Sequence, residues 1–508
     1  MNLIKKILQI SITILFSRIS GFVRDVCIAN YFGTTPEIGI FFIAFKIPNF
    51  LRKIFAEGAF FQAFFPIFIE YKKNNSHKKT KKFFSLIFGW LLLILVIISI
   101  TGVIFSSVFL FLLAPGILFI YKQYFDLANN LIKIVFPYLV FISLSCLFNI
   151  ALYAWKKLFI PVISPFFLNF SIVCFILFFY PFHLGEETIF LSFSVLFGGI
   201  LQCLYQIPFL KKIDMLVFPK IEFHKDAFLV FQKTCSGILV SIVPQISYIT
   251  STIIFSFLVP NSISWIYYTE RIIEIPCGIL CYAITVILLP YLSRLIQKKN
   301  YSKYYKTIQN SIKIGAICTI PVSIAVFTLS FPIVVCFFQY GKFSYFDSFI
   351  VSKFLKIASI GIFFTIVYKI LLLGFISRKD FKTPIQASFY TMIFSQLTNL
   401  LLVYFLKQEG MFISLIFSNV FNCVFLFFRM KKKSIFSIKN YQKTLIKIFF
   451  SSLFMVFFLK FFLSYFIFFE NFETKKKFFY LFSAIFLGIF VYFSVFSIFE
   501  INYKNFRN

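Results

Sequence analysis

The feature that most constrains the fold is a series of continuous apolar runs, each long enough to cross a bilayer as a helix. A membrane-spanning helix needs about 20 mainly apolar residues. Because the runs are continuous rather than alternating, they favour helices over membrane strands. The sequence therefore predicts an all-α polytopic membrane protein with fourteen spans, near 7–30, 37–70, 84–112, 131–155, 158–180, 189–209, 228–257, 263–293, 311–337, 349–376, 384–405, 411–428, 445–468 and 478–499.

Composition excludes a soluble enzyme. Hydrophobic residues make up 60% of the chain and charged residues 13%, whereas about a quarter of a typical soluble domain is charged. No connection between predicted spans reaches 25 residues, which leaves no room for a soluble catalytic domain. The formal net charge of +32 would indicate nucleic acid in a soluble protein, but here we expect a basic membrane rim and no nucleic-acid partner.

The basic residues favour one side of the membrane. The even-numbered connections carry 26 Lys and Arg, and the odd-numbered ones carry six, three of which are Lys475 to Lys477. Cytoplasmic loops of membrane proteins are enriched in these residues. We therefore expect a multi-pass protein of the bacterial inner membrane with both termini in the cytoplasm, and the three lysines before the last span argue against this orientation.

The two halves of the chain resemble each other weakly. In each half the second span is long and charged and has a proline near its middle, Pro48 and Pro276. Internal repeats with interrupted helices around a central site are typical of transporters. The sequence thus predicts an N-terminal lobe at 1–210, a C-terminal lobe at 211–430 and two added helices at 431–508, with Pro48 and Pro276 as hinges.

Ionisable residues inside apolar spans are costly, and they usually face a cavity or a partner. Here they concentrate in three spans, the first, second and eighth. Guanidinium groups suit phosphate oxygens because one group donates two parallel hydrogen bonds. Three arginines without partners near in sequence favour a cationic cavity for a pyrophosphate-bearing substrate. The alternative is salt bridges that only join helices, such as a pair between Lys53 and Glu57. The residues are Arg18, Arg24, Asp25, Lys46, Arg52, Lys53, Glu57, Glu270, Arg271 and Glu274.

Motifs for other chemistry are missing from the sequence. It contains no nucleotide-binding P-loop, no nucleophile elbow and no combination of His and Cys spaced for a metal. We expect neither enzymatic activity, nor a cofactor, nor a metal site.

Several segments resemble the MviN/MurJ family of bacterial lipid II flippases, a branch of the MOP exporter superfamily. They follow one another in order along most of the chain. The first two are long and specific, whereas the last two spans match only in position and apolarity. The segments are Phe16-Ser-Arg-Ile-Ser-Gly-Phe-Val-Arg-Asp25, Ala44-Phe-Lys-Ile-Pro-Asn-Phe-Leu-Arg-Lys-Ile-Phe-Ala-Glu-Gly58, Gln62-Ala-Phe-Phe-Pro66, Ser264-Trp-Ile-Tyr-Tyr-Thr-Glu-Arg271, Phe338-Gln-Tyr-Gly-Lys-Phe343 and Ser377-Arg-Lys-Asp-Phe-Lys-Thr-Pro384.

This resemblance implies a fold and a function. The fold is two six-helix lobes around a central cavity, plus two helices that form a groove for a lipid tail. The function is movement of the undecaprenyl-pyrophosphate-linked peptidoglycan precursor from the cytoplasmic to the periplasmic leaflet, for cell wall synthesis and cell shape. The residues that match the family's substrate-binding positions are Arg18, Arg24, Asp25, Arg52 and Arg271.

One position departs from the family pattern. The family usually carries an acidic residue early in the second span, where this chain has Gly39. The nearest acid is Glu37, so a gate built on a salt bridge must use Glu37 or work differently. Besides Glu37, the residues expected to act in gating or structure are Lys46, Lys53, Glu57, Glu270 and Glu274.

Three alternatives stay open at this stage. The chain resembles other MOP exporters in class, either O-antigen-type flippases or multidrug antiporters. It would also fit a non-transporting scaffold of the wall-synthesis machinery. Lipid II and membrane lipids are the expected partners, and contacts with cell-wall synthesis proteins are left open.

Overall fold

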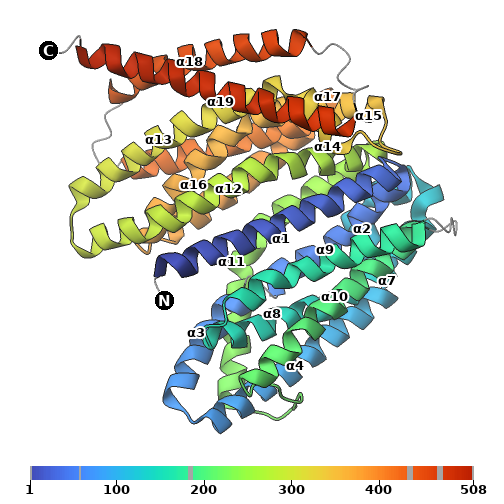
Figure 1. Cartoon of the computed structure of the whole chain (residues 1–508). Helices are drawn as coiled ribbons and strands as arrows, with labels where there is room; N and C mark the ends of the chain where they lie inside the picture. The colour runs from blue at the N-terminus through green and yellow to red at the C-terminus, as the bar shows by residue number, and fades with distance from the viewer. Residues whose placement is uncertain (1–2, 56–58, 181–186, 432–438, 466–472, 506–508) are drawn as a thin grey trace. The chain divides into compact units, whose positions relative to one another are not determined.

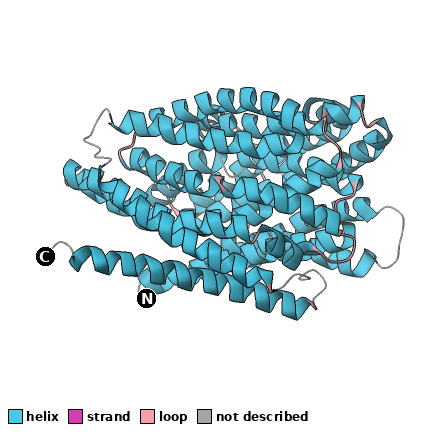
Figure 2. Cartoon of the chain, turned by 90° about the horizontal axis from the view of Figure 1, so that it is seen from above, coloured by secondary structure: helices cyan, strands magenta, loops and turns pink. Residues whose placement is uncertain are grey.

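The computed structural model describes residues 3–55, 59–180, 187–431, 439–465 and 473–505. Within these ranges every regular element is a helix (Figure 2). The chain divides into two compact units, Met1–Ser264 (unit 1) and Trp265–Asn508 (unit 2). Each unit is described by itself.

Unit 1 is a bundle in which α9 packs against both α1 and α10, while α11 packs against α3 and α2 (Figure 1). The helix α12 (Asn261–Gln297) begins at its end and continues into unit 2. The other elements of unit 1 are α1 (Leu3–Phe32), α2 (Pro36–Phe55), α3 (Ala59–Asn74), α4 (His77–Ile104), α5 (Ser106–Leu113), α6 (Pro115–Phe119), the short 3-10 helix η1 (Lys122–Tyr124), α7 (Phe125–Val135), α8 (Tyr138–Ala154), α9 (Phe159–Phe179), α10 (Glu187–Lys212) and α11 (Lys225–Ser256).

Unit 2 pairs α16 with α13 and α17, and α18 with α19. An apolar cluster joins α12, α13, α16 and α17 through residues such as Leu292, Ile308, Ile370 and Leu426. The helix α17 is two helices in succession, because Lys407 has a non-helical backbone. The elements are α13 (Tyr301–Thr328), α14 (Ser330–Phe338), α15 (Tyr345–Ser359), α16 (Gly361–Ser377), α17 (Lys382–Lys431), α18 (Lys439–Ser464) and α19 (Thr474–Asn505).

The predicted fold class is confirmed. Each predicted span coincides with one helix or with consecutive helices, and α17 accounts for two spans around its break. By length and apolarity alone, nine helices of the described chain qualify as spans, or ten if the bent pair α15 and α16 counts as one. The two predicted hinge prolines, Pro48 and Pro276, lie inside α2 and α12, both of which continue past them. Their role as hinges stays a prediction.

Four helices end in the same turn at predicted cytoplasmic connections. In each turn one residue adopts a left-handed backbone, and the next N–H donates to the carbonyl five residues earlier. This is the geometry of a Schellman motif, which satisfies carbonyls left open at a helix end. The position usually holds glycine, whereas this chain uses Lys156, Asp214, Lys299 and Lys379.

The boundary predicted between the two lobes differs from the boundary between the two compact units. Prediction placed the first boundary at 210/211, and the compact units meet at 264/265. The reason is α11, which packs against α3, α2 and α6. The three-part functional division stays a prediction.

One of the three lysines before the last span is packed inside unit 2. Lys477 is buried, with its Nζ atom 5.6 Å from the centre of the Tyr340 ring. Lys476 is exposed and lies 4.0 Å from Glu473, three residues earlier. The packing of Lys477 gives its charge a structural use independent of membrane orientation.

Candidate functional site

The strongest polar cluster of unit 1 joins α1 to α9. The Arg24 guanidinium donates to Asp25 Oδ1 from Nη2 at 2.7 Å and from Nε at 3.0 Å. Its Nη1 atom donates to Asn169 Oδ1 at 3.0 Å, and the Asn169 amide donates to Ser20 Oγ at 2.9 Å. We call these four residues, Ser20, Arg24, Asp25 and Asn169, the α1–α9 cluster.

Burial makes this cluster energetically important. Arg24 is 8% exposed and Asp25 is 1% exposed. An isolated buried charge is very costly, whereas a paired and hydrogen-bonded one is tolerated. The expectation that the arginines lack partners near in sequence is therefore wrong for Arg24, since the next residue neutralises it. Asn169 was missed in the sequence, although it is the one amide in the apolar run 158–180.

The other predicted residues of the first two spans lie in varied surroundings. Arg18 is exposed, although it is only six residues from the buried Arg24. Arg52 is half-buried and Lys53 is exposed, and both lie in the last turn of α2. Cations are favoured there because the carbonyl end of a helix carries partial negative charge. Glu57 lies outside the described residues, so its predicted pairing with Lys53 is not described.

Lys46 lies on the face of α2 that meets α11. It lines a small, mainly apolar cavity together with Ile47, Phe50 and Thr252. Lys46 itself is half-buried. A cation beside apolar walls suits either gating or structure, and its role stays a prediction.

Gly39 lies where the backbone of α2 closely approaches the turn before α12. A Cβ atom built on Gly39 would lie 2.6 Å from the Pro260 carbonyl oxygen and 3.4 Å from Ser264 Oγ. The acid that the family usually has at this position would therefore collide with backbone and face a carbonyl oxygen. Glu37, two residues earlier, lies in the first turn of α2, where the helix dipole favours a negative charge.

In unit 2, Arg271 interacts with its own helix. Its Nη1 atom donates to Glu274 Oε2 at 2.6 Å, and its guanidinium lies 4.7 Å from the centre of the Tyr267 ring. Arg271 is thus a second arginine with a carboxylate close in sequence, contrary to expectation. Glu274 is exposed and Glu270 is half-buried.

The structure therefore gathers some of the predicted residues and leaves others apart. It joins Arg24 with Asp25, and Arg271 with Glu274. The first pair belongs to unit 1 and the second to unit 2, so convergence of the four arginines on one chamber stays a prediction. A polar contact that the sequence did not reveal joins Trp265 Nε1 to Asp347 Oδ1 at 2.8 Å in unit 2.

A large apolar cavity lies in unit 2 between α13 and α18. Its volume is about 700 Å³, and its walls include Ile320, Ile324, Phe449, Phe450 and Leu453. Such a lining offers no specific polar recognition, but it suits a hydrocarbon chain. The described residues contain no group of three or more His, Cys, Asp or Glu side chains that could hold a metal ion.

Comparison with known proteins decides the family. A family model described as "Lipid II flippase MurJ" matches residues 28–487. This chain belongs to the MurJ family. The probable lipid II flippase MurJ of Buchnera aphidicola subsp. Acyrthosiphon pisum is 39% identical over 440 residues, 86% of each chain. The lipid II flippase MurJ of Burkholderia cenocepacia is 34% identical over 86% of this chain and 85% of its own.

Solved structures agree with this MurJ assignment. A lipid II flippase MurJ in an inward closed conformation matches with a TM-score of 0.81 at 25% identity, covering 98% of this chain and all of that one. An inward-facing multidrug resistance MATE transporter of the MOP superfamily matches with a TM-score of 0.63 at 13% identity, covering 82% of this chain and 94% of that one. The MATE match shows a shared fold alone. By its family, the chain is a membrane transporter and not an enzyme.

Proposed function

We propose that this chain translocates lipid II, the lipid-linked peptidoglycan precursor, from the cytoplasmic to the periplasmic leaflet of the bacterial inner membrane. The observation that carries the proposal is membership of the MurJ family over residues 28–487, with relatives named lipid II flippases that align with most of the chain. Transport would serve cell wall synthesis.

The mechanism we infer is alternating access between two lobes. The head group enters from the cytoplasmic side while the polyprenyl tail stays in lipid. The apolar cavity between α13 and α18 supports this division, because it provides a hydrocarbon surface on the predicted C-terminal part of the chain. In this proposal, the groove for the lipid tail includes α13 as well as α18.

We assign binding of the substrate's pyrophosphate to arginine side chains. Arg18 is exposed and so open to a ligand. The Nε, Nη1 and Nη2 atoms of Arg24 are engaged by Asp25 and Asn169, so a substrate would compete with these two residues for the guanidinium. Arg52 and Arg271 complete the proposed set. An inside-negative potential favours outward movement of anionic pyrophosphate by about 2.3 kcal/mol per charge per 100 mV.

The test is complementation of a bacterium depleted of its own flippase, followed by measurement of lipid II in each leaflet. Restored growth together with lipid II in the outer leaflet supports the proposal. Growth without restored translocation would instead support a scaffold. An unchanged inner-leaflet pool after loss of this chain from its own cell would contradict flipping.

The residue assignment needs its own variants. Arg18→Ala should abolish translocation without loss of thermal stability, since Arg18 is exposed. Lys133→Ala, an exposed cation of α7 that lies outside the proposed site, is the matched control for loss of one positive charge. Equal translocation by both variants would remove Arg18 from the site.

A further inference from the structure

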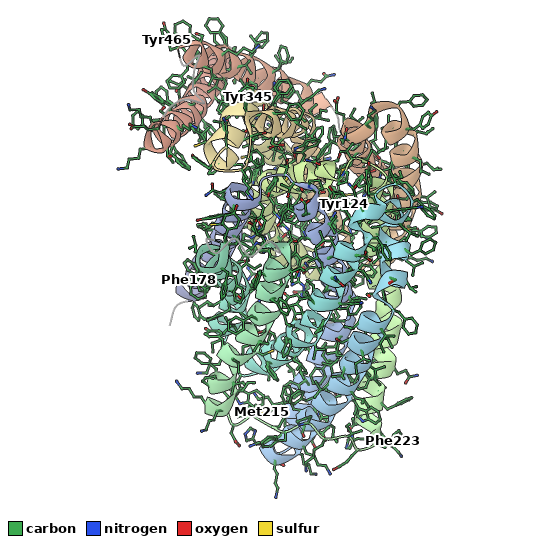
Figure 3. The ribbon with its side chains drawn as sticks, turned by 90° about the vertical axis from the view of Figure 1, so that its right-hand side faces the viewer. Tyr124, Phe178, Met215, Phe223, Tyr345 and Tyr465 are labelled. Carbon is green, nitrogen blue, oxygen red and sulfur yellow. The ribbon has the colours of Figure 1, made fainter. Side chains whose placement is uncertain are left out.

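The connection between α10 and α11, residues 213–224, has an unusual surface for a loop. Met215 is buried, but three other apolar side chains are exposed: Phe218 is 88% exposed, Phe223 is 78% exposed and Ile221 is 56% exposed. Figure 3 labels Met215 and Phe223 on this segment. Contiguous exposed apolar groups mark a surface that binds a partner or a membrane.

This connection is held firmly along α4. Ser85 Oγ donates to the Phe218 carbonyl, and the Lys220 N–H donates to the Ser85 carbonyl at 3.2 Å. The Trp90 indole donates to the Glu222 carbonyl at 3.1 Å. A Cβ atom on Gly89 would lie only 2.1 Å from the Lys220 carbonyl oxygen, so the two backbones are in close contact.

Ion pairs secure both ends of the same connection. Lys81 and His77 at the start of α4 contact Asp214. Lys82 Nζ lies 3.2 Å from Glu222 Oε2. The hydrogen bond from Lys81, together with the charges of Lys81 and His77, lowers the pKa of Asp214 below its ordinary value. The exposed phenylalanines are therefore presented on a fixed backbone.

The position of the connection along α4 points to the membrane interface as its partner. Lys82 is the last charged residue before the apolar run of α4 begins at Phe83. Trp90 lies eight residues further, about 12 Å at 1.5 Å per residue. Segments that lie in the membrane interface bury their apolar face roughly 5–10 Å into the boundary between head groups and acyl chains. The contacts at Ser85 and Trp90 lie about 5 and 12 Å along α4 from Lys82, so the connection extends through the depth of the interface, where tryptophan itself is enriched.

The charged residues around the connection also favour a membrane surface as its partner. Within and next to the connection, the lysines Lys211, Lys212, Lys220 and Lys225 are all exposed. The two acids, Asp214 and Glu222, are already paired with lysines of α4. Basic residues beside a membrane surface attract anionic lipid at about 1 kcal/mol each.

We propose that residues 213–224 form an interfacial anchor: Phe218, Ile221 and Phe223 insert into the bilayer while the neighbouring lysines bind anionic lipid head groups. The anchor holds the start of α11 at a fixed depth. The Ser85 and Trp90 side chains donate to carbonyls of the connection, and the Ser85 carbonyl accepts from the Lys220 N–H. Because α4 satisfies these backbone groups, the non-helical segment meets lipid at a lower cost than irregular backbone usually does.

The experiment uses the full chain reconstituted at high lipid excess into vesicles with bromine on the acyl chains. Phe218→Trp and Phe223→Trp are compared with Asn74→Trp, an exposed position at the end of α3 in another predicted cytoplasmic connection. The added fluorescence, taken as the difference from the parent chain, should fall about twofold at positions 218 and 223 because acyl-chain bromine reaches groups in the interface. Asn74→Trp should change little.

The head-group preference is tested with brominated phosphatidylglycerol against brominated phosphatidylcholine at equal mole fraction. Quenching of Phe223→Trp should be stronger with the anionic lipid, and Lys211→Gln with Lys212→Gln and Lys220→Gln should abolish the difference. Absence of quenching at 218 and 223 would overturn the anchor and favour a protein partner. Equal quenching at all three positions, or equal quenching by both lipids, would also overturn the proposal as stated.

Discussion

Replacing Asn169 by alanine tests whether the α1–α9 cluster holds the first span in place. The change removes the acceptor of the Arg24 Nη1–H bond and the donor to Ser20 Oγ. A hydrogen bond to a charged group contributes about 1.5–3 kcal/mol, and a neutral one about 1 kcal/mol. Because Arg24 is only 8% exposed, water replaces the lost acceptor poorly. We expect Asn169→Ala to lower the free energy of unfolding by about 2 kcal/mol or more.

The cysteines of this chain provide the assay. All nine described cysteines are free, and each is buried or half-buried. A thiol-reactive dye therefore reports unfolding in detergent or in lipid discs. A loss of 2 kcal/mol corresponds to a fall of about 4 °C or more in the thermal midpoint for a unit of this size. Ser20→Ala removes only neutral bonds, the one from Asn169 and its own to the Ser17 carbonyl, so it should lower the midpoint less than Asn169→Ala does.

A double-mutant cycle separates this contact from general loss of packing. Combining Asn169→Ala with Arg24→Met should give a coupling of about 1.5–3 kcal/mol. A coupling near zero, or a midpoint for Asn169→Ala equal to that of the parent chain, would refute the idea that this amide stabilises the buried guanidinium.

Three further changes test other parts of the structure. Gly39→Ala should lower the free energy of unfolding by about 1–3 kcal/mol through overpacking, because the added Cβ would lie 2.6 Å from the Pro260 carbonyl oxygen. The thiol assay measures this loss, and an unchanged midpoint would mean that α2 is not held against the turn before α12. Lys299→Gly should raise the midpoint slightly, since Lys299 has a φ of 55° and a left-handed non-glycine residue costs about 1 kcal/mol; Lys298→Gly, at the preceding position, is the control and should not. Acidification should release the α10–α11 connection: the pKa of Asp214 is lowered from its ordinary 3.8, so its stabilising contribution is present above pH 3.8 and lost as the pH falls through the lower folded-state pKa. Trp90 emission should follow this release, and an Asp214→Asn variant should show no such transition.

The fold was largely predictable because burial of apolar surface in a bilayer has a simple signature. Continuous apolar runs fixed the helices, and lysines between them marked the turns. What the pattern did not reveal was how spans break. Hydropathy predicts a single span at 349–376, yet the chain bends between α15 and α16. The break at Lys407, in contrast, lies in the connection predicted between the spans 384–405 and 411–428.

Spacing along the helices does not predict the partners of the charged residues. Arg18 and Asp25 lie seven residues apart on one face of a helix, yet Asp25 pairs with Arg24, its neighbour in sequence. A long guanidinium side chain can fold back along the helix to an adjacent residue, so spacing of Cα atoms alone does not choose between partners. Asn169 comes from a helix 145 residues away in sequence, and only tertiary packing brings it to Arg24.

The α1–α9 cluster limits how Arg24 can act on a substrate. Its fork already donates two bonds to one carboxylate oxygen and a third to an amide. A pyrophosphate offers the same kind of acceptor as Asp25, so the exchange of one for the other changes few hydrogen bonds but leaves a buried carboxylate without its cation, at a cost of several kcal/mol. That cost falls only if α1 moves relative to α9 so that water reaches Asp25. Under the proposed mechanism, Arg18 therefore meets the head group first, and engagement of Arg24 is coupled to the movement of α1, which makes this contact a natural point at which substrate binding drives the change of state.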